Sequence, residues 1–269
     1  MTSLNEIRGR LTELSPLIHC ITNPISINQC ANAILAVGAR PMMAEHPDEA
    51  AAITRSAGAL MLNLGNFTDV HAKSMVISAA TAKEHGIPFI LDVCGAACLP
   101  NRREYALNLA KQSTPTVIKG NRPEITALYD NGYSTSGVDG DSSLSLEKSD
   151  AAAAALAKKL GCIVLASGAA DTVTDGTRLT HLYNGTPRLG SITGTGCMQG
   201  ALCAAFLAVC GGYEAAVCAC VLQGICGELC EDTKGSGSFA AALMDGISTV
   251  TDDDIIPRLR MEEINIEDA

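Results

Sequence analysis

Short apolar runs alternate with helix-like segments through the first two thirds of the chain, and this alternation constrains the fold more than any other feature. Residues 17–21, 59–64 and 88–92 are three such runs, each nearly uniform in apolar character. A strand with one face in water alternates apolar and polar side chains, whereas a strand of a parallel sheet covered on both faces does not. The pattern therefore predicts an α/β fold, a three-layer sandwich whose mostly parallel central sheet carries helices on both faces.

The remaining elements follow from the same periodicities. We expect an extended segment at 41–44, strands at 116–119 and 162–166, and helices at 28–37, 47–56, 68–85, 103–111, 123–130 and 149–160. Residues 172–174 and 177–183 flank Asp175-Gly176, a dipeptide typical of a tight hairpin turn, so the sheet should end in an antiparallel edge. Helices at 197–210, 213–230 and 236–249 should fill the C-terminal third. Residues 131–145 are expected to form a surface loop and residues 262–269 a solvated end.

Composition and charge exclude several classes of function. No Pro/Ser-rich linker divides the 269 residues, which predicts one domain over residues 1–269. The formal net charge of -10 disfavours nucleic acid or an anionic membrane as a partner, because either needs a basic face. The apolar run 200–212 is too short to span a bilayer. The 12 cysteines lack metal-site spacings and no signal-peptide pattern is visible, so reduced thiols in a cytoplasmic protein are expected.

Ligands of an open parallel sheet gather at the carboxyl ends of its strands. The residues that end or follow the expected strands are Asn23, Met43, Asn63, Gly65, Asp92, residues 119–124, Ser167, Gly168 and the loop at 194–197. In that loop, Gly194 and Gly196 flank Thr195 directly before a helix, where unpaired N–H groups and the helix dipole can bind an anion. A lone Gly-x-Gly can also serve close packing alone, and neither a P-loop nor a Rossmann fingerprint is present. Because the other candidate residues are expected at the same rim, a phosphate site is favoured over close packing alone.

Five side chains near this rim could carry chemistry. Asp92 and Glu124 could hold Mg²⁺ through water, or act as a helix N-cap and a first-turn acid. Lys119 and Arg122 could meet the phosphates of ATP, or be ordinary surface cations. Cys197, in the first turn of the helix after the glycines, could be a general base, a nucleophile or a small residue that fits.

With these positions assembled, the sequence resembles the hydroxyethylthiazole kinases, a family of the ribokinase-like superfamily that acts in thiamine salvage. The matching blocks are His19-Cys20-Ile21-Thr22-Asn23-Pro24, Pro41-Met42-Met43-Ala44, Leu62-Asn63-Leu64-Gly65, Leu91-Asp92, Ile118-Lys119-Gly120-Asn121 with Glu124, and Gly194-Thr195-Gly196-Cys197. They keep the family's order and spacing over nearly the whole chain. Two departures stand near the rim: Val93-Cys94 replaces the family's usual Pro-Val, and Asn66-Phe67 replaces Thr-Leu.

The resemblance implies an ATP- and Mg²⁺-dependent kinase that phosphorylates the hydroxyl group of 4-methyl-5-(2-hydroxyethyl)thiazole. It also implies a homotrimer with active sites at the subunit interfaces. The residue roles that it implies are thiazole contacts for Met43 and Gly194, ATP contacts for Lys119 and Ser167, and organisation of Mg²⁺ by Asp92 and Glu124. Cys197 stands where related ribokinase-like enzymes place a catalytic aspartate.

Three alternatives stay open at this point. A ribokinase-like kinase of another small alcohol, such as hydroxymethylpyrimidine, would share most of these residues. A non-catalytic homologue that binds thiazole or nucleotide would share them too. Acyl or thiol transfer would use Cys197 as a nucleophile and would need a histidine within hydrogen-bonding reach; the nearest in sequence is His181.

Overall fold

A computed structural model describes residues 3–135 and 144–266 of the chain. Within these residues, nine strands form one sheet in the order β2-β1-β3-β4-β5-β6-β7-β8-β9. The strands are β1 (Leu17–Ile21), β2 (Arg40–Met42), β3 (Ala59–Asn63), β4 (Phe89–Asp92), β5 (Val117–Asn121), β6 (Ile163–Ser167), β7 (Asp171–Thr174), β8 (Arg178–Leu182) and β9 (Met261–Asn265). β1 to β6 pair in parallel, and β6 to β9 pair antiparallel. The mostly parallel sheet with an antiparallel edge is therefore confirmed.

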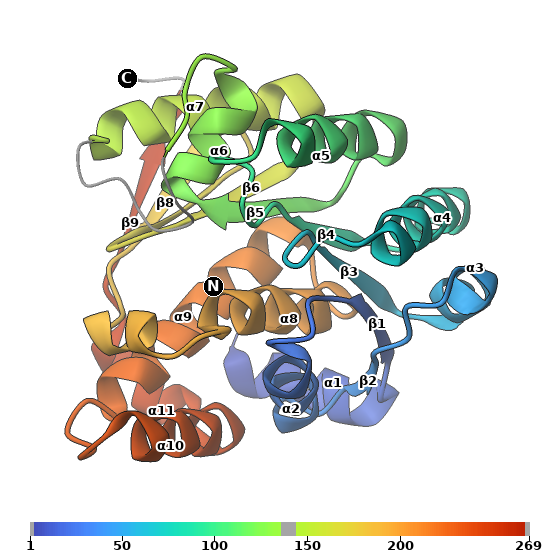
Figure 1. Cartoon of the computed structure of the whole chain (residues 1–269). Coiled ribbons are helices and arrows are strands. Elements are labelled where there is room, and N and C mark those ends of the chain that lie inside the picture. Colours follow the sequence, from blue (N-terminus) through green and yellow to red (C-terminus); the bar gives the residue numbers. More distant parts are fainter. Residues whose placement is uncertain (1–2, 136–143, 267–269) are drawn as a thin grey trace.

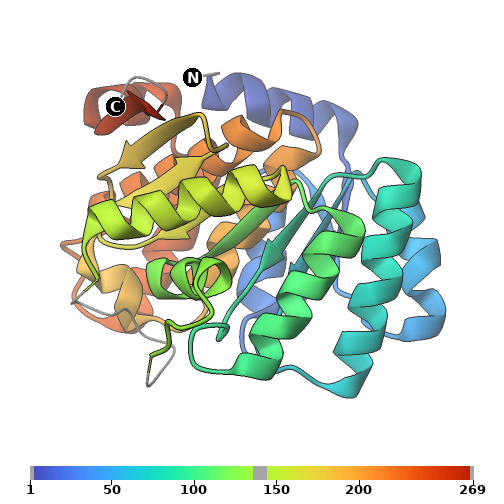
Figure 2. The same cartoon turned by 90° about the horizontal axis from the view of Figure 1, so that it is seen from above.

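Helices cover both faces of the sheet (Figure 1). The helices are α1 (Leu4–Leu14), α2 (Ile27–Ala36), α3 (Pro47–Ser56), α4 (Asp69–His85), α5 (Pro100–Ser113), α6 (Arg122–Tyr129), α7 (Leu146–Leu160), α8 (Thr195–Leu207), α9 (Gly212–Leu229), α10 (Ser236–Thr249) and α11 (Asp252–Ile255). α1, α2, α8, α9 and α10 share one hydrophobic core, and α4, α5, α6 and α7 share the other. Figure 2 shows α4, α5 and α7 lying across the near face of the sheet. The predicted three-layer sandwich is confirmed.

Capping residues set the helix boundaries where the sequence predicts them. α3 begins at Pro47, a residue suited to the first helical position, and carries Asp48 and Glu49 in its first turn. The Thr68 side chain caps α4, which ends at Gly86 in a left-handed conformation with φ 66°. The predicted helices at 47–56 and 68–85 are thus confirmed.

The C-terminal segment differs from its prediction. Residues 261–265 are not a solvated end but form β9, which pairs antiparallel with β8. Glu262 accepts a hydrogen bond from the Tyr183 hydroxyl at 2.9 Å. Most side chains of this strand are exposed, so the segment lacks the apolar pattern that predicts a strand. Backbone pairing with β8, rather than burial, holds it in the sheet. Residues 267–269 lie outside the described part of the chain.

Two other segments complete the comparison with the sequence. Leu4–Leu14 forms α1, which the periodicity did not predict. Of the expected loop at 131–145, residues 131–135 are a turn and irregular segment, and residues 136–143 lie outside the described residues. Among the described helices, none combines the length and the apolar character that crossing a bilayer would require.

The strand order reverses at β1, and in an open sheet such a reversal marks the position of a ligand crevice at the carboxyl edge. From β1 the chain passes through α2, which packs against α8, to reach β2 on one side of β1. It returns through α3, which packs on α4, to reach β3 on the other side. Such a reversal leaves room for a ligand at the carboxyl ends of the two flanking strands, here β1 and β3.

Candidate active site

Asp92 and Lys119 form a buried ion pair at the carboxyl ends of two neighbouring strands. The register of β4 and β5 sets them opposite each other, and Lys119 Nζ lies 2.9 Å from Asp92 Oδ2. Burial is the largest single effect and would lower the pKa of Lys119, but the neighbouring acidic groups, Asp92 foremost, together outweigh it and raise the pKa above its usual value. Lys119 is therefore a permanent cation under the rim.

The first turns of α8 lie directly against this pair because two of their residues have no side chain. A Cβ at Gly200 would lie 3.0 Å from Met61 Cε and 3.5 Å from Asp92 Oδ2, and one at Gly196 would lie 3.4 Å from Lys119 Nζ. The glycines thus let the helix N-terminus, with its unpaired N–H groups, approach a buried positive charge. An anion bound at this point would meet both.

The loop at 194–197 has a fixed shape. Gly194 caps α8 in the left-handed region, with φ 89°. Gln29 Nε2 donates to the Thr193 carbonyl at 3.3 Å, and Gln223 Nε2 donates to the Thr195 carbonyl at 2.8 Å. Side chains of α2 and α9 therefore hold the backbone of the loop from two sides.

Glu124 is fixed at the start of α6 and shares the electrostatic environment of Asp92. Glu124 Oε2 accepts from the Asn121 N–H at 2.7 Å, and the Asn121 side chain accepts from the Glu124 N–H at 2.9 Å. Glu124 Oε1 accepts from the Gly95 N–H at 2.6 Å. Burial, followed by the charge of Asp92, raises the pKa of Glu124 to about 7. The helix-start role that the sequence left open for Glu124 is present, in a capping box.

The two carboxylates fit a hydrated Mg²⁺ ion and not a closed metal cage. Among the described residues, no three His, Cys, Asp or Glu side chains are grouped to hold a metal. Mg²⁺ usually keeps several waters and is bound through one or two carboxylates together with substrate phosphates. Burial first, and then the negative charge of Asp92, raise the pKa of Glu124, and a cation between the two carboxylates would offset both effects. The donor set therefore suits an ion that arrives with a nucleotide.

Cys197 lies half-buried at the crevice between β1 and β3. Asn23, which follows β1, places Nδ2 3.2 Å from Cys197 Sγ. Asn63, the last residue of β3, places Nδ2 3.3 Å from the same sulfur. The rim residues that the sequence predicts from separate strands thus meet at this thiol.

No histidine contacts Cys197 in the described part of the chain. The five histidines of the sequence, His19, His46, His71, His85 and His181, each have another hydrogen-bonding partner. A cysteine nucleophile needs a base in reach. The geometry therefore gives no support to acyl or thiol transfer.

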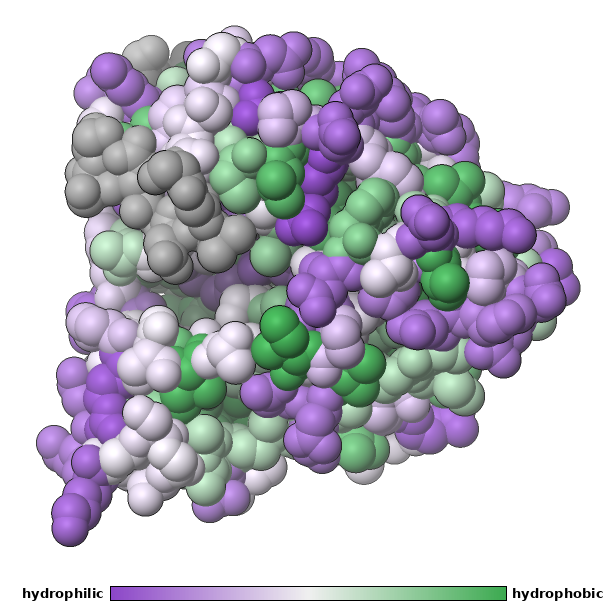
Figure 3. All heavy atoms as spheres, in the orientation of Figure 1, coloured by the Kyte–Doolittle hydropathy of each residue, from purple (hydrophilic) through white to green (hydrophobic). Residues whose placement is uncertain are grey.

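A cleft of about 800 Å³ opens beside the 194–197 loop. Its lining includes Arg122, Ser167, Gly168, Thr195 and Gly196. The volume lies within the usual range for small-molecule sites. In Figure 3 the surface is hollowed at the left, between the upper and lower helical layers. Of the two residues predicted to contact ATP, Ser167 lines the cleft, whereas Lys119 lies behind Gly196 and pairs with Asp92.

Five polar residues of the cleft were missed by sequence reasoning, and three of them, Asp171, Gln199 and Gln223, come from β7, α8 and α9. Gln199 Nε2 donates to Asp171 Oδ2 at 2.8 Å, and Asp171 Oδ1 accepts from the Gly168 N–H at 2.9 Å. Gln223 is the third. Burial raises the pKa of Asp171. The sequence does carry a signal for two of them, because Gln199 and Gln223 are polar residues within otherwise apolar helical segments.

Met43 follows β2 and lies half-buried against the core that contains α2 and α8. Because β2 is parallel to β1, Met43 lies at the same edge of the sheet as Asn23. The residue after Met43, Ala44, is held in place by the buried His19, whose Nε2 donates to the Ala44 carbonyl at 2.9 Å. Because Nε2 carries the ring proton, the other ring nitrogen, Nδ1, accepts from the Thr54 hydroxyl at 2.9 Å. A contact of Met43 or Gly194 with a thiazole stays a prediction.

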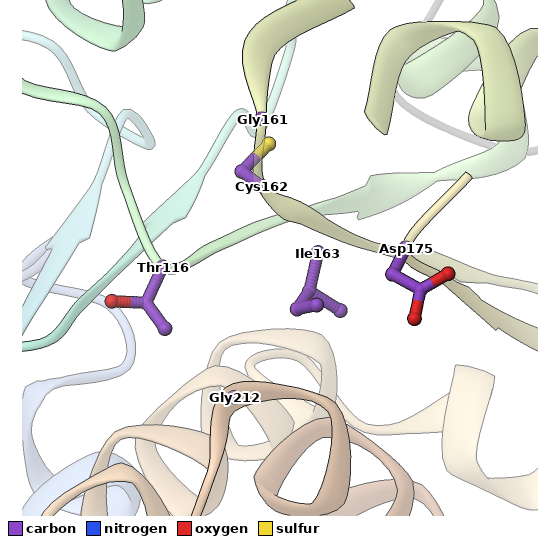
Figure 4. A pocket seen from close by; sticks show the side chains of 6 residues that line it. All are labelled: Thr116, Gly161, Cys162, Ile163, Asp175 and Gly212. Carbon is purple, nitrogen blue, oxygen red and sulfur yellow. The ribbon is translucent and has the colours of Figure 1, made fainter. Parts of the chain in front are cut away.

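A second, smaller hollow lies at the opposite edge of the sheet, at the amino ends of β5 and β6 (Figure 4). It measures about 310 Å³ and is lined by Thr116, Gly161, Cys162, Ile163, Asp175 and Gly212. Asp175 accepts hydrogen bonds from Thr177 and Arg178 within its own hairpin turn. The polar side chain is thus occupied, and the hollow gathers none of the predicted site residues.

Comparison with known proteins gives consistent matches. The model of the hydroxyethylthiazole kinase family matches residues 9–253. Hydroxyethylthiazole kinase 2 of Clostridium botulinum (strain Langeland) is 43% identical over 261 residues, covering 95% of this chain and 98% of that protein. The structure of the hydroxyethylthiazole kinase protein of Pyrococcus horikoshii OT3 is 34% identical, with a TM-score of 0.88 over 97% of this chain and 99% of that one.

A more distant structural neighbour shares the fold alone. The pyridoxal kinase of Staphylococcus aureus, solved in complex with AMP-PCP and pyridoxal, has a TM-score of 0.62 at 14% identity, covering 93% of this chain and 99% of that chain.

Proposed function

This chain belongs to the hydroxyethylthiazole kinase family, a group of ribokinase-like kinases, and from that premise we propose that its reaction takes place at the rim around the 194–197 loop. There the γ-phosphate of ATP passes to the hydroxyl group of 4-methyl-5-(2-hydroxyethyl)thiazole. The observation that carries this assignment is the approach of the α8 N-terminus to the buried Lys119–Asp92 pair, beside a cleft of nucleotide-compatible size.

Phosphoryl transfer requires positioning and charge neutralisation more than covalent chemistry by the protein. The N–H groups of the 194–197 loop bind the transferred phosphate, and Lys119 adds a positive charge behind Gly196. Ser167 and the neighbouring Gly168 and Arg122 contact the rest of the nucleotide in the cleft. The loop is held rigidly by Gln29 and Gln223, so little reorganisation is needed when phosphate binds.

Asp92 and Glu124 would hold the waters of a Mg²⁺ ion. When bound, the ion neutralises phosphate charge and orients the phosphate oxygens. Glu124 is suited to this task because backbone N–H groups fix both of its oxygens in place. Asp92 is fixed as well, because the Lys119 ammonium donates to its Oδ2 and the Cys94 N–H donates to its Oδ1.

Cys197 faces the acceptor alcohol, with Met43 and Gly194 against the thiazole ring. A sulfur at this position can take the hydroxyl proton as the new bond forms. Base catalysis contributes modestly in a loose transition state, so a thiol suffices where related kinases carry an aspartate.

We also propose that the enzyme is a cytoplasmic homotrimer. The segments around the crevice carry exposed apolar side chains, among them Ile25 after β1, Leu35 on α2, Met42 on β2 and Val70 at the start of α4. Green side chains gather near the centre of the face shown in Figure 3. Apolar groups beside a binding site suit a subunit interface.

The test is an ADP-release assay with three acceptors: hydroxyethylthiazole, hydroxymethylpyrimidine and pyridoxal. We expect ADP release that requires the thiazole and stops when Mg²⁺ is chelated. Equal or higher turnover with hydroxymethylpyrimidine would favour the alternative kinase. No turnover with any acceptor would favour a binding protein and overturn the proposal.

A further inference from the structure

Two buried asparagines direct their amide groups at a single sulfur atom. The donor atoms, Asn23 Nδ2 and Asn63 Nδ2, come from the ends of β1 and β3, the two strands that flank the crevice. Asn23 is 6% exposed and Asn63 is 0% exposed. Both side chains are therefore immobilised by their surroundings, and their orientation is a property of the fold.

The orientation of each amide is fixed by a backbone N–H group on its oxygen. Asn63 Oδ1 accepts from the Gly65 N–H at 2.8 Å, and Asn23 Oδ1 accepts from the Ser26 N–H at 3.2 Å. Rotating either amide by half a turn would set N–H groups against each other. The nitrogens must therefore face Cys197.

An amide nitrogen donates and does not accept, so the Cys197 sulfur is the acceptor of both hydrogen bonds. The S–H group of a neutral thiol must then point away from the two asparagines. Hydrogen bonds to the charged form of a group stabilise that form, and they are stronger than those to a neutral acceptor. Two donors thus favour negative charge at this position, on a thiolate or on an aspartate.

We propose that Asn23 and Asn63 are positioning residues that aim the side chain at position 197 toward the acceptor alcohol and stabilise its negative charge. This inference rests on the proposed function, in which Cys197 takes the hydroxyl proton. In that step the alcohol oxygen forms a bond to the γ-phosphorus while the bond to the bridging oxygen breaks. ADP leaves with the electron pair, and the hydroxyl proton moves to the thiolate sulfur.

The inference is tested by removing one amide in three backgrounds. In the wild-type background, Asn63→Ala should lower kcat about tenfold, with a much smaller change in KM for the thiazole. In a Cys197→Asp background the loss should recur, because a carboxylate also accepts from the amide. In a Cys197→Ala background Asn63→Ala should change kcat by less than about twofold. Asn23→Ala should repeat the pattern.

Equal losses in all three backgrounds would overturn the inference, because the amide would then act on the substrate or on the fold. Asn101→Ala, an exposed asparagine in the first turn of α5, is the matched control and should leave kcat unchanged. Thermal melting of each variant separates unfolding from a specific effect.

A second measurement does not need kinase activity. The ultraviolet absorbance of thiolate is measured at a fixed pH of about 8 for the wild-type protein and for Cys197→Ser, and the second value is subtracted from the first. We expect this difference to be positive. It should become smaller when Asn63→Ala is introduced into both proteins. An unchanged difference would overturn the inference. Failure of the acceptor assay alone, with this absorbance pattern present, would instead overturn the proposed function.

Discussion

At position 197, the proposed phosphoryl-transfer site could accommodate either a thiol or a carboxylate. Cys197 accepts hydrogen bonds from Asn23 and Asn63, and the same two donors would suit a carboxylate. The phosphate itself is expected to contact backbone N–H groups, which no substitution at 197 to a similar-sized residue removes.

Exchange of this thiol gives the first prediction. Cys197→Asp should keep or raise kcat, because a carboxylate is ionised near neutral pH and is therefore available to accept the proton. Cys197→Ala should be slower by about 10- to 100-fold and still measurable, since positioning and charge neutralisation remain. Steady-state kinetics with hydroxyethylthiazole provide the check. Complete loss of activity in Cys197→Asp would contradict the role given to this position.

His19 gives a prediction about stability and pH. Burial lowers its pKa in the folded protein, whereas an unfolded histidine titrates near about 6.5. As the pH falls below that value, the unfolded chain takes up a proton that folded His19 resists, so the free energy of unfolding decreases. His19→Gln should therefore show a shallower loss of stability between about pH 6.5 and 5 in denaturant titrations. A slope equal to that of the wild-type protein would contradict the prediction.

At the scale of the element, the N-terminus of α8 concentrates the requirements of the site. It needs a left-handed residue at Gly194, and it needs no side chain at Gly196 and Gly200, where the helix packs on Lys119 and Asp92. The packing of one helix end on two strand ends thus brings the proposed anion site close to Asp92 and Lys119.

Gly194→Ala tests this requirement. Alanine would hold an unfavourable backbone conformation, at a cost of about 1 kcal/mol, and its Cβ would lie 3.1 Å from Ser26 Cβ. We expect a small loss of stability but more than about tenfold loss of kcat/KM, because the N–H groups of the loop would shift. Gly237→Ala, in α10 with no atom within 4 Å of the new Cβ, should be neutral or stabilising with full activity. Similar behaviour of the two variants in melting and kinetic assays would argue against the loop's role.

The strands and their ends show which features of the fold and of the site could be predicted from the sequence. Buried parallel strands such as β3 and β4 are uniformly apolar, so their ends, and hence Asn63 and Asp92, were located correctly at the rim. The hydrogen bond from Asn63 to Cys197 joins residues 134 positions apart. That contact depends on strand order, which hydrophobic periodicity does not encode. β9 was missed because most of its side chains are exposed and so give no apolar pattern, unlike those of the buried strands.

At the scale of the whole molecule, an acidic protein gathers local positive charge at the proposed phosphate site. The formal net charge is -10, yet the rim offers a helix N-terminus, Lys119 and Arg122 to phosphate. This contrast favours a small anionic substrate over an extended polyanion, which would meet the acidic surface beyond the site.

The proposed trimer gives a prediction at this scale. Light scattering during size-exclusion chromatography should give about three times the chain mass of 27.8 kDa. Ile25→Asp, at a 57% exposed position beside the crevice, should weaken the assembly and lower activity with it. Leu14→Asp, at a 61% exposed position at the end of α1, should do neither. A fully active monomer would contradict the proposed assembly.

The most direct test of the central claim is a competition for one limiting supply of ATP. Wild-type protein, Mg²⁺ and ATP are incubated with equal concentrations of hydroxyethylthiazole, hydroxymethylpyrimidine and pyridoxal, and mass spectrometry identifies the phosphorylated products. The structure and the family predict that hydroxyethylthiazole phosphate dominates and that Gly194→Ala loses most of it. A mixture dominated by either other phosphate, or no phosphorylated product from wild-type protein, would contradict the account.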